Sequence, residues 1–152
     1  MTFREATRAD LPEIVRLLAD DPLGQARETP GEVIPDAYFA AFDAIDKDPG
    51  NSVIVAEIGG SIAGTLQLTF IPGLTYTGAE RAQIEGVRIS AEHRGMGLGQ
   101  ALIRWAIDQA RARGCRVVQL TTDRQRPDAI RFYQKIGFRP SHMGMKYHLK
   151  DR

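Results

Sequence analysis

The stretch that decides the fold is Val87-Arg88-Ile89-Ser90-Ala91-Glu92-His93-Arg94-Gly95-Met96-Gly97-Leu98-Gly99-Gln100-Ala101-Leu102. It reads as the end of a strand, a glycine-rich turn and the start of an amphipathic helix. The alternate glycines allow backbone N–H groups to approach a ligand closely, because glycine has no Cβ atom. The first N–H groups of a helix have no intrahelical partner and lie at the positive end of the helix dipole. Together with the charge of Arg94, they predict a phosphate-binding turn.

The composition is typical of a globular protein and predicts one domain over residues 1–152. The formal net charge of +1 gives no reason to expect nucleic acid or an anionic membrane as a partner. The lone Cys115 has no disulfide partner, which fits a reducing compartment, and we read it as a buried, inert thiol. No apolar run is long enough to span a bilayer, and the N-terminus lacks the apolar core of a signal peptide. We therefore expect a cytoplasmic protein.

Outward from the turn, hydrophobic periodicity and turn residues predict the other elements. The predicted strands cover 2–6, 52–58, 62–71, 82–89, 116–121 and a final region within 138–149, and the predicted helices cover 11–18, 35–46, 98–113 and 127–136. Residues 22–33 read as a loop. The order β-α-α-β-β-β-α-β-α-β predicts an α+β fold. We expect a mixed, mostly antiparallel sheet of six to seven strands with helices on both faces.

Three phosphate-binding templates compete for the turn. The dinucleotide fingerprint fails because Gln100 stands at its last glycine position, and the phosphate loop of nucleotide hydrolases fails because no Gly-Lys-Ser/Thr tripeptide occurs. The third template, Arg/Gln-x-x-Gly-x-Gly/Ala between a strand and a long helix, is filled completely by Arg94-Gly95-Met96-Gly97-Leu98-Gly99.

On this motif the chain resembles the GCN5-related N-acetyltransferase (GNAT) superfamily. The strand order and the segment Ala129-Ile130-Arg131-Phe132-Tyr133-Gln134-Lys135-Ile136-Gly137-Phe138 extend the resemblance over essentially the whole chain. The resemblance implies acetyl-coenzyme A as co-substrate, with its pyrophosphate on Arg94, Gly95, Met96, Gly97, Leu98, Gly99 and Gln100. We expect the pantetheine arm to pair with the backbone of Val87 and Ile89, in the manner of strand addition.

Two side chains are candidates for acid–base chemistry. Alternation along the strand predicts that Glu85 points to the same side as Val87 and Ile89. The resemblance implies that Glu85 acts as the base through water, although it could equally be an ordinary solvated glutamate. It implies that Tyr133 protonates the thiolate of coenzyme A, which is compatible with a core position for its ring. A backbone N–H near Ile89 would stabilise the oxyanion if the strand bulges there.

The chain offers no Ser-His-Asp or Cys-His arrangement, which favours direct transfer of the acetyl group in a ternary complex over an acyl-enzyme. The three histidines are scattered, so no metal site is predicted. The acceptor, a small-molecule or peptide amine, stays open, and so do a homodimer and two other functions: a non-catalytic acyl-coenzyme A sensor and a generic nucleotide-phosphate binder. Arg126 stands where many relatives have an asparagine that touches the coenzyme, so that contact is not transferred.

Overall fold

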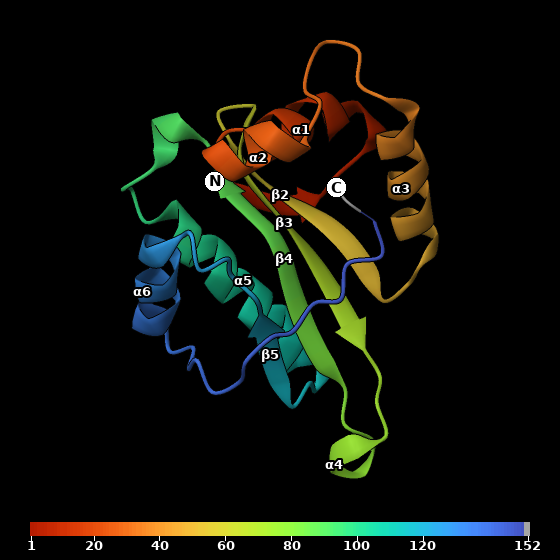
Figure 1. Cartoon of the computed structure of the whole chain (residues 1–152), viewed down its shortest axis with the longest axis vertical. Helices are drawn as coiled ribbons and strands as arrows, with labels where there is room; N and C mark the ends of the chain where they lie inside the picture. The colour runs from red at the N-terminus through yellow and green to blue at the C-terminus, as the bar shows by residue number, and fades with distance from the viewer. Residues whose placement is uncertain (151–152) are drawn as a thin grey trace. The chain divides into compact units, whose positions relative to one another are not determined.

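The structure is a computed structural model that describes residues 1–150. It divides into two compact units, Met1–Gln119 and the chain from Leu120 onward, and each is described by itself. The strands are β1 (Thr2–Glu5), β2 (Asn51–Ile58), β3 (Ser61–Ile71), β4 (Arg81–Ile89) and β5 (Val117–Leu120). The helices are α1 (Leu11–Leu18), α2 (Pro22–Arg27), α3 (Asp36–Lys47), the single turn α4 (Thr75–Gly78), α5 (Leu98–Arg113) and α6 (Pro127–Ile136) (Figure 1). Short 3-10 turns cover Arg8–Asp10 and Ala91–His93.

The described residues form one sheet in the order β1-β2-β3-β4-β5. Strands β1 to β4 pair antiparallel, and β4 connects to β5 through α5. The sheet thus has five strands in the part of the chain described, and the six or seven expected from the sequence are not confirmed. The final strand predicted within residues 138–149 is wrong: the structure has no strand there, and Met143, Met145, Tyr147 and Leu149 are 76%, 91%, 88% and 89% exposed. An apolar segment does not make a strand by itself, because a strand also needs a partner for its backbone hydrogen bonds.

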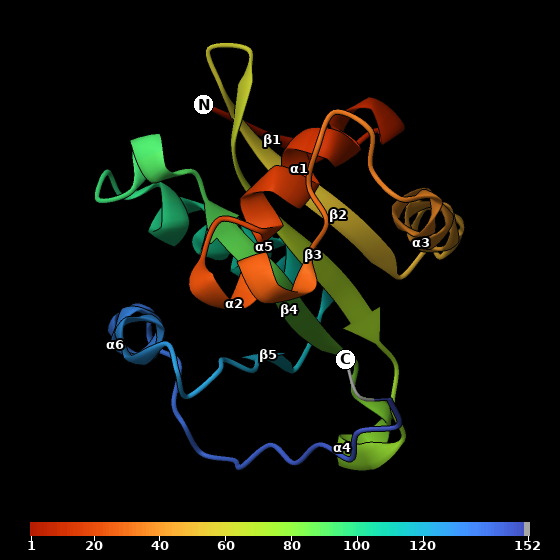
Figure 2. The same cartoon turned by 45° about the horizontal axis from the view of Figure 1, so that its top comes forward.

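Helices cover both faces of the sheet in the first unit, as expected. On one face, which we call the α1 face, Leu11, Ile14 and Val15 of α1 and Phe42 of α3 pack around Val55 of β2. On the other, the α5 face, Leu98 packs with Ala56, Ala63 and the partly buried Ile89. Figure 2 shows α1 and α5 on opposite sides of the strands. The register of the strands therefore decides which side chains of β4 face α1.

The expected loop over residues 22–33 begins with the helix α2. The Asp21 side chain caps it by accepting a hydrogen bond of 2.5 Å from the backbone N–H of Gly24, and Pro22 occupies its first position. Gly24 is buried, and a Cβ atom there would lie 2.0 Å from the carbonyl oxygen of Leu18. This contact packs α2 tightly against the end of α1 and fixes the link at Asp20 and Asp21.

The second unit contains α6, which starts at Pro127 and ends at Gly137 as the sequence predicts. The Tyr133 ring packs edge-on against Phe132 and Phe138, with ring centroids 5.1 Å and 5.7 Å apart. Tyr133 is therefore part of an aromatic cluster within its own unit.

Candidate active site

Strand β4 carries a β-bulge at the point where the sequence carries a glycine. Glu85 pairs with Gln67 of β3, whereas Arg88 pairs with Thr65, so β4 has one extra residue between these pairs. Gly86 lies in this interval with φ +61°, the left-handed region that glycine adopts without a Cβ penalty. The bulge leaves the extra residue outside the regular ladder, which exposes backbone hydrogen-bonding groups next to Glu85.

The bulge corrects the predicted orientation of Glu85. Through Gln67, Glu85 aligns with Val53, which packs against the α1-face core, and Arg88 aligns through Thr65 with Val55 on that same face. Ile89 pairs with Gly64 and packs on the α5 face. The extra residue shifts the alternation by one position, so Glu85 shares a face with Arg88 and not with Ile89.

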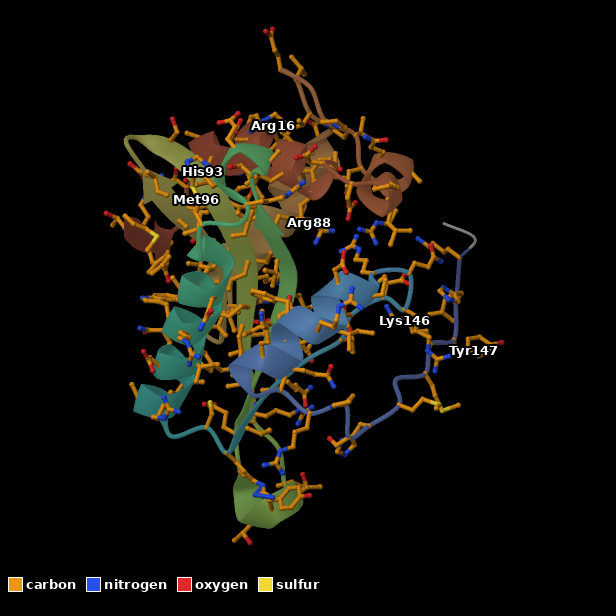
Figure 3. All side chains as sticks on the ribbon, turned by 90° about the vertical axis from the view of Figure 1, so that its left-hand side faces the viewer. Arg16, Arg88, His93, Met96, Lys146 and Tyr147 are labelled. Atoms are coloured by element: carbon orange, nitrogen blue, oxygen red, sulfur yellow. The ribbon has the colours of Figure 1, made fainter. Side chains whose placement is uncertain are left out.

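The turn after β4 has the geometry of an anion site. Gly97 is the N-cap of α5 with φ +79°, and Gly95 has φ +77°. A Cβ atom at either glycine would have nothing within 4 Å, so the space above their backbone is open. Leu98 is buried at 4% exposure and anchors the start of α5, whereas Met96 on the turn is 72% exposed (Figure 3). Gly99 is the second residue of α5, so its backbone N–H has no partner within the helix.

Neighbouring contacts hold the turn in place. The Ser90 side chain is buried, its N–H donates to the carbonyl of Ala63 at 2.8 Å, and its Oγ lies 2.6 Å from Nδ1 of His93. His93 therefore supports the turn through its contact with Ser90.

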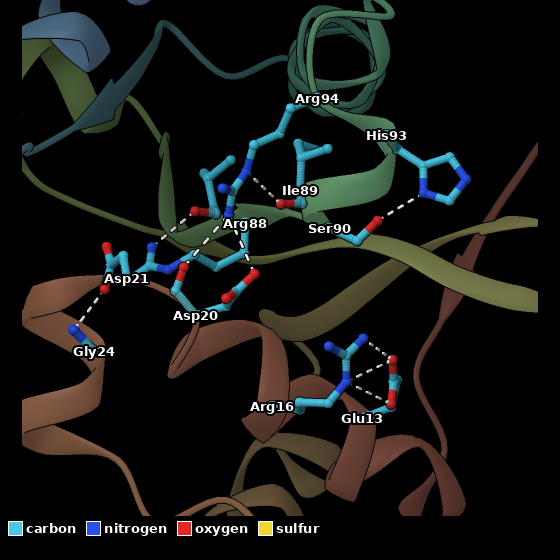
Figure 4. Close-up of polar contacts among 11 residues, drawn as sticks. Glu13, Arg16, Asp20, Asp21, Gly24, Arg88, Ile89, Ser90, His93 and Arg94 are labelled. Carbon is cyan, nitrogen blue, oxygen red and sulfur yellow. Dashed lines mark hydrogen bonds and ion pairs between the residues drawn. The ribbon is translucent and has the colours of Figure 1, made fainter.

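Arg94 folds back from the turn towards the sheet and α1 (Figure 4). Its Nε donates to the carbonyl of Ile89 at 3.2 Å, and its terminal nitrogen lies 3.4 Å from both the carbonyl oxygen and Oδ2 of Asp20. The pair is exposed, 53% for Arg94 and 40% for Asp20. The Arg94 side chain thus connects the glycine turn to the α1–α2 link.

Glu85 lies within a row of polar side chains on the α1 face. The Gln83 amide nitrogen donates to Oε1 of Glu85 at 2.8 Å, and the Gln119 amide nitrogen donates to Oε1 of Gln83 at 2.9 Å. On β3, Gln67 donates to Oδ1 of Asn51 at 3.0 Å. Glu85 is therefore not an isolated surface carboxylate but the end of an ordered chain of amides.

The predicted site residues fall into two groups. Glu85, Val87, Ile89 and the turn from Arg94 to Gln100 come together in the first unit, along β4 and into α5. Tyr133 and Arg126 belong to the second unit, on and beside α6. The roles of these residues stay predictions.

Cys115 has the character of an inert thiol. Burial raises its pKa, and the neighbouring carboxylate of Glu80 raises it further. The sulfur lies 3.8 Å from that carboxylate, which itself receives a hydrogen bond of 2.6 Å from Arg113. The thiolate form of Cys115 is therefore disfavoured.

The chain after α2 and the connection between β3 and β4 both have defined structures. Tyr38 donates to Glu28 at 2.9 Å, which ties the chain after α2 to α3. In the β3–β4 connection, Tyr76 and Thr77 adopt left-handed conformations, and Arg116 stacks over the Tyr76 ring at 3.5 Å.

Over residues 1–150, no helix is long and apolar enough to cross a membrane, and no cluster of three metal-ligating side chains occurs.

The sequence profile described as "Acetyltransferase (GNAT) family" matches residues 11–138. The chain belongs to this family. Among solved structures, the crystal structure of a transcriptional regulator from Bacillus halodurans C-125 has a TM-score of 0.94 and 53% identity to this chain, covering 97% of this chain and 99% of that one.

Curated GNAT relatives are more distant. The aminoalkylphosphonate N-acetyltransferase of Salmonella typhimurium is 27% identical over 92% of this chain and 86% of its own length. N-acetyltransferase 8 of Rattus norvegicus is 33% identical over 60% of this chain. The chain spans 40% of the length of that rat protein, and 26% and 53% of the length of two other curated N-acetyltransferases that it matches.

Sequence reasoning missed the residues around the phosphate turn that lie outside its motif. The sequence predicts only a helix end and a loop at Asp20 and Asp21, although Asp followed by Pro is a common helix start. It predicts a regular strand, without a bulge, through Arg88. A glycine inside a strand pattern is a known sign of a bulge, so Gly86 carried the signal that would have corrected the faces of β4.

Proposed function

We propose that this GNAT-family chain transfers an acetyl group from acetyl-coenzyme A to a primary amine, by direct attack in a ternary complex. The observation that carries this proposal is the continuity of the site. The open glycine turn with Arg94 follows directly from a strand whose bulge at Gly86 exposes backbone next to Glu85. The pyrophosphate site and the acid–base site are thus built on one continuous segment.

The turn residues fit the donor. The N–H groups at the start of α5 and the guanidinium of Arg94 would bind the pyrophosphate, and the open space over Gly95 and Gly97 would admit it. The backbone of Val87 and Ile89 would hold the pantetheine arm. Acetyl-coenzyme A, when bound, supplies the activated acetyl thioester.

Two side chains of the protein, Glu85 and Tyr133, would carry out the proton transfers. Glu85, directly or through water, takes the proton that the amine must lose to become a nucleophile. A backbone N–H at the bulge stabilises the oxyanion while the carbon–nitrogen bond forms and the carbon–sulfur bond breaks. Tyr133 returns a proton to the departing thiolate. The acetyl group ends on the amine nitrogen, which loses two protons in all. Glu85 passes the first to solvent. The second, released as the tetrahedral intermediate collapses, replaces the proton that Tyr133 gave to the thiolate.

The state of Cys115 supports direct transfer. An acyl-enzyme on cysteine would need a reactive thiolate, but burial and Glu80 both raise the pKa of this thiol. Cys115 is also the only cysteine in the sequence.

A second function has one observation in its favour. The solved structure that is 53% identical to this chain bears the name of a transcriptional regulator, so a coenzyme-binding sensor is the alternative. Retention of Glu85 beside the bulge favours the enzyme, because a sensor has no need for a positioned base.

The deciding experiment measures coenzyme A release by chromatography, with acetyl-coenzyme A and a panel of aminoalkylphosphonates, amino sugars and peptides. We expect turnover with at least one class of amine. In Glu85→Gln and Tyr133→Phe, kcat should fall by about 10²-fold or more, the usual range for loss of a general acid or base. Tight coenzyme binding without turnover would establish the sensor. Unchanged turnover in both variants would refute the assigned roles but not the enzyme class.

A further inference from the structure

The feature that points beyond the proposed function is the chain of hydrogen bonds from β5 to Glu85. Gln119 donates to Gln83 at 2.9 Å, and Gln83 donates to Glu85 at 2.8 Å. All three residues lie in the first unit, and the hydrogen bonds join two strands, with Gln119 on β5 and both Gln83 and Glu85 on β4. We call these three side chains the amide relay.

The direction of the relay is fixed by the charge at its end. An ionised carboxylate only accepts hydrogen bonds, so Gln83 must turn its NH2 group towards Glu85. The carbonyl oxygen of Gln83 then faces Gln119, which must also present its NH2 group. A single charge on Glu85 thereby sets the orientation of two amides, and successive bonds of this kind polarise and strengthen each other.

We propose that Gln83 and Gln119 are positioning residues, which hold Oε1 of Glu85 so that its second oxygen stays available to take the proton. The inference rests on the proposed role of Glu85 as the base. A glutamate has three rotatable side-chain bonds, and Glu85 is exposed at the surface of the sheet, so its carboxylate needs an anchor to keep one position. Placement matters because a base must lie within hydrogen-bond reach of the proton it removes.

The sheet supplies a matched control. Gln67 is the Cα partner of Glu85 on β3 and lies on the same face, but its amide donates to Asn51 and not to Glu85. Replacing Gln83 or Gln67 by methionine keeps the side-chain length and removes the amide. Only Gln83→Met removes hydrogen bonds of the amide relay.

The kinetic test compares these variants on an amine that the protein acetylates. We expect Gln83→Met to lower kcat by about tenfold, since displacement of a catalytic group by ~1 Å can cost up to 10²-fold. The KM for acetyl-coenzyme A should stay within about twofold, and Gln67→Met should leave kcat within about twofold. In a Glu85→Gln background, Gln83→Met should cause no further loss, because no carboxylate remains to be positioned. Equal losses in both backgrounds, or equal kcat in Gln83→Met and Gln67→Met, would overturn the inference.

A second test needs no turnover and therefore separates the relay from the proposed function. The side-chain amide signals of Gln119 are followed by ¹⁵N–¹H NMR. Glu85→Gln should shift them in the otherwise unchanged protein, because the relay transmits the loss of charge. The same substitution in the Gln83→Met background should leave them in place. An equal shift in both backgrounds would rule out the relay, whether or not an amine is acetylated. If Glu85→Gln retains full turnover, the base assignment fails instead.

Discussion

Replacing Gly86 by alanine tests whether the bulge aims the site. Gly86 has φ +61°, and a Cβ atom there would meet Leu18 Cδ2 at 3.7 Å, an ordinary contact. The cost is therefore backbone strain and not a clash. A left-handed conformation costs a residue other than glycine about 1–2 kcal/mol. Alanine also reduces the conformational freedom of the unfolded chain, which stabilises the folded protein by about 0.4–1 kcal/mol. The net loss in the free energy of unfolding is therefore ~1 kcal/mol.

Gly60 provides the control for this substitution. It lies in the β2–β3 turn with φ +82°, and a Cβ atom there would have nothing within 4 Å. Gly60→Ala should thus lose about the same stability, ~1 kcal/mol, as measured by urea unfolding followed by circular dichroism. Only Gly86→Ala should also lose activity, by about tenfold in kcat, because relief of its strain re-aims Glu85. If both variants lose equal stability and keep equal kcat, the bulge does not position the site.

Three further predictions follow from the charges around the turn and the first helix. Arg94→Gln should weaken coenzyme A binding by about tenfold or more in calorimetry, since hydrogen bonds to charged groups are worth about 1.5–3 kcal/mol. Asp20→Asn should tighten coenzyme A binding by up to about fivefold, because exposed ion pairs contribute about 0.2–1 kcal/mol and this pair competes for Arg94. Asp10→Asn should lower stability at neutral pH but not in acid. The Asp10 carboxyl has its pKa lowered below 3.8, chiefly by a hydrogen bond from Arg4, so its stabilisation is present above about pH 4 and is lost as the pH falls through the folded-state pKa.

Each of these predictions has a control and an outcome against it. Arg111→Gln removes an exposed arginine of α5 that pairs with Asp108, and it should leave coenzyme A affinity unchanged. Equal affinities for Arg94→Gln and Arg111→Gln would remove Arg94 from the phosphate site. Unchanged affinity in Asp20→Asn would show that the ion pair does not compete with the ligand. Urea unfolding of Asp10→Asn and the parent chain should give curves that converge in acid, and a constant gap would contradict the assigned cause.

The sequence predicted the glycine turn and the helix after it well because the determinants of this local structure are local; its binding of phosphate stays a prediction. Gly114 ends α5 in the left-handed conformation typical of that position, and Gly97 at its start is also left-handed, which glycine adopts without a Cβ penalty. The capping of the first helix shows the limit of such reasoning. Asp10 fits a capping spacing before Leu11, but its carboxylate instead accepts a bond of 2.7 Å from the N–H of Thr7 and pairs with Arg4. An aspartate close to two helix starts can cap either of them. Here the ion pair with Arg4 of β1 holds the Asp10 carboxylate at the first one, beside Thr7.

The faces of β4 could not be derived from local pattern alone. Alternation assigns Glu85 and Ile89 to one side, and a single extra residue at Gly86 separates them. Whether a strand glycine produces a bulge depends on the register with the partner strand, here on the pairing of Arg88 with Thr65. Such a pairing joins residues more than twenty positions apart. The Gln83–Gln119 bond is likewise invisible in sequence, because it needs the registers of two strands.

The environment of Cys115 has a practical consequence for measuring the reaction. Reagents that report a newly released thiol by disulfide exchange react with the thiolate form. The protein has one cysteine, and burial together with Glu80 holds its pKa above the ordinary value, so little of it is thiolate near neutral pH. A continuous colorimetric assay with such a reagent should therefore show a slow protein background. Its signal would therefore measure the coenzyme A thiol released in each turnover, and the native chain could be used without replacing its cysteine.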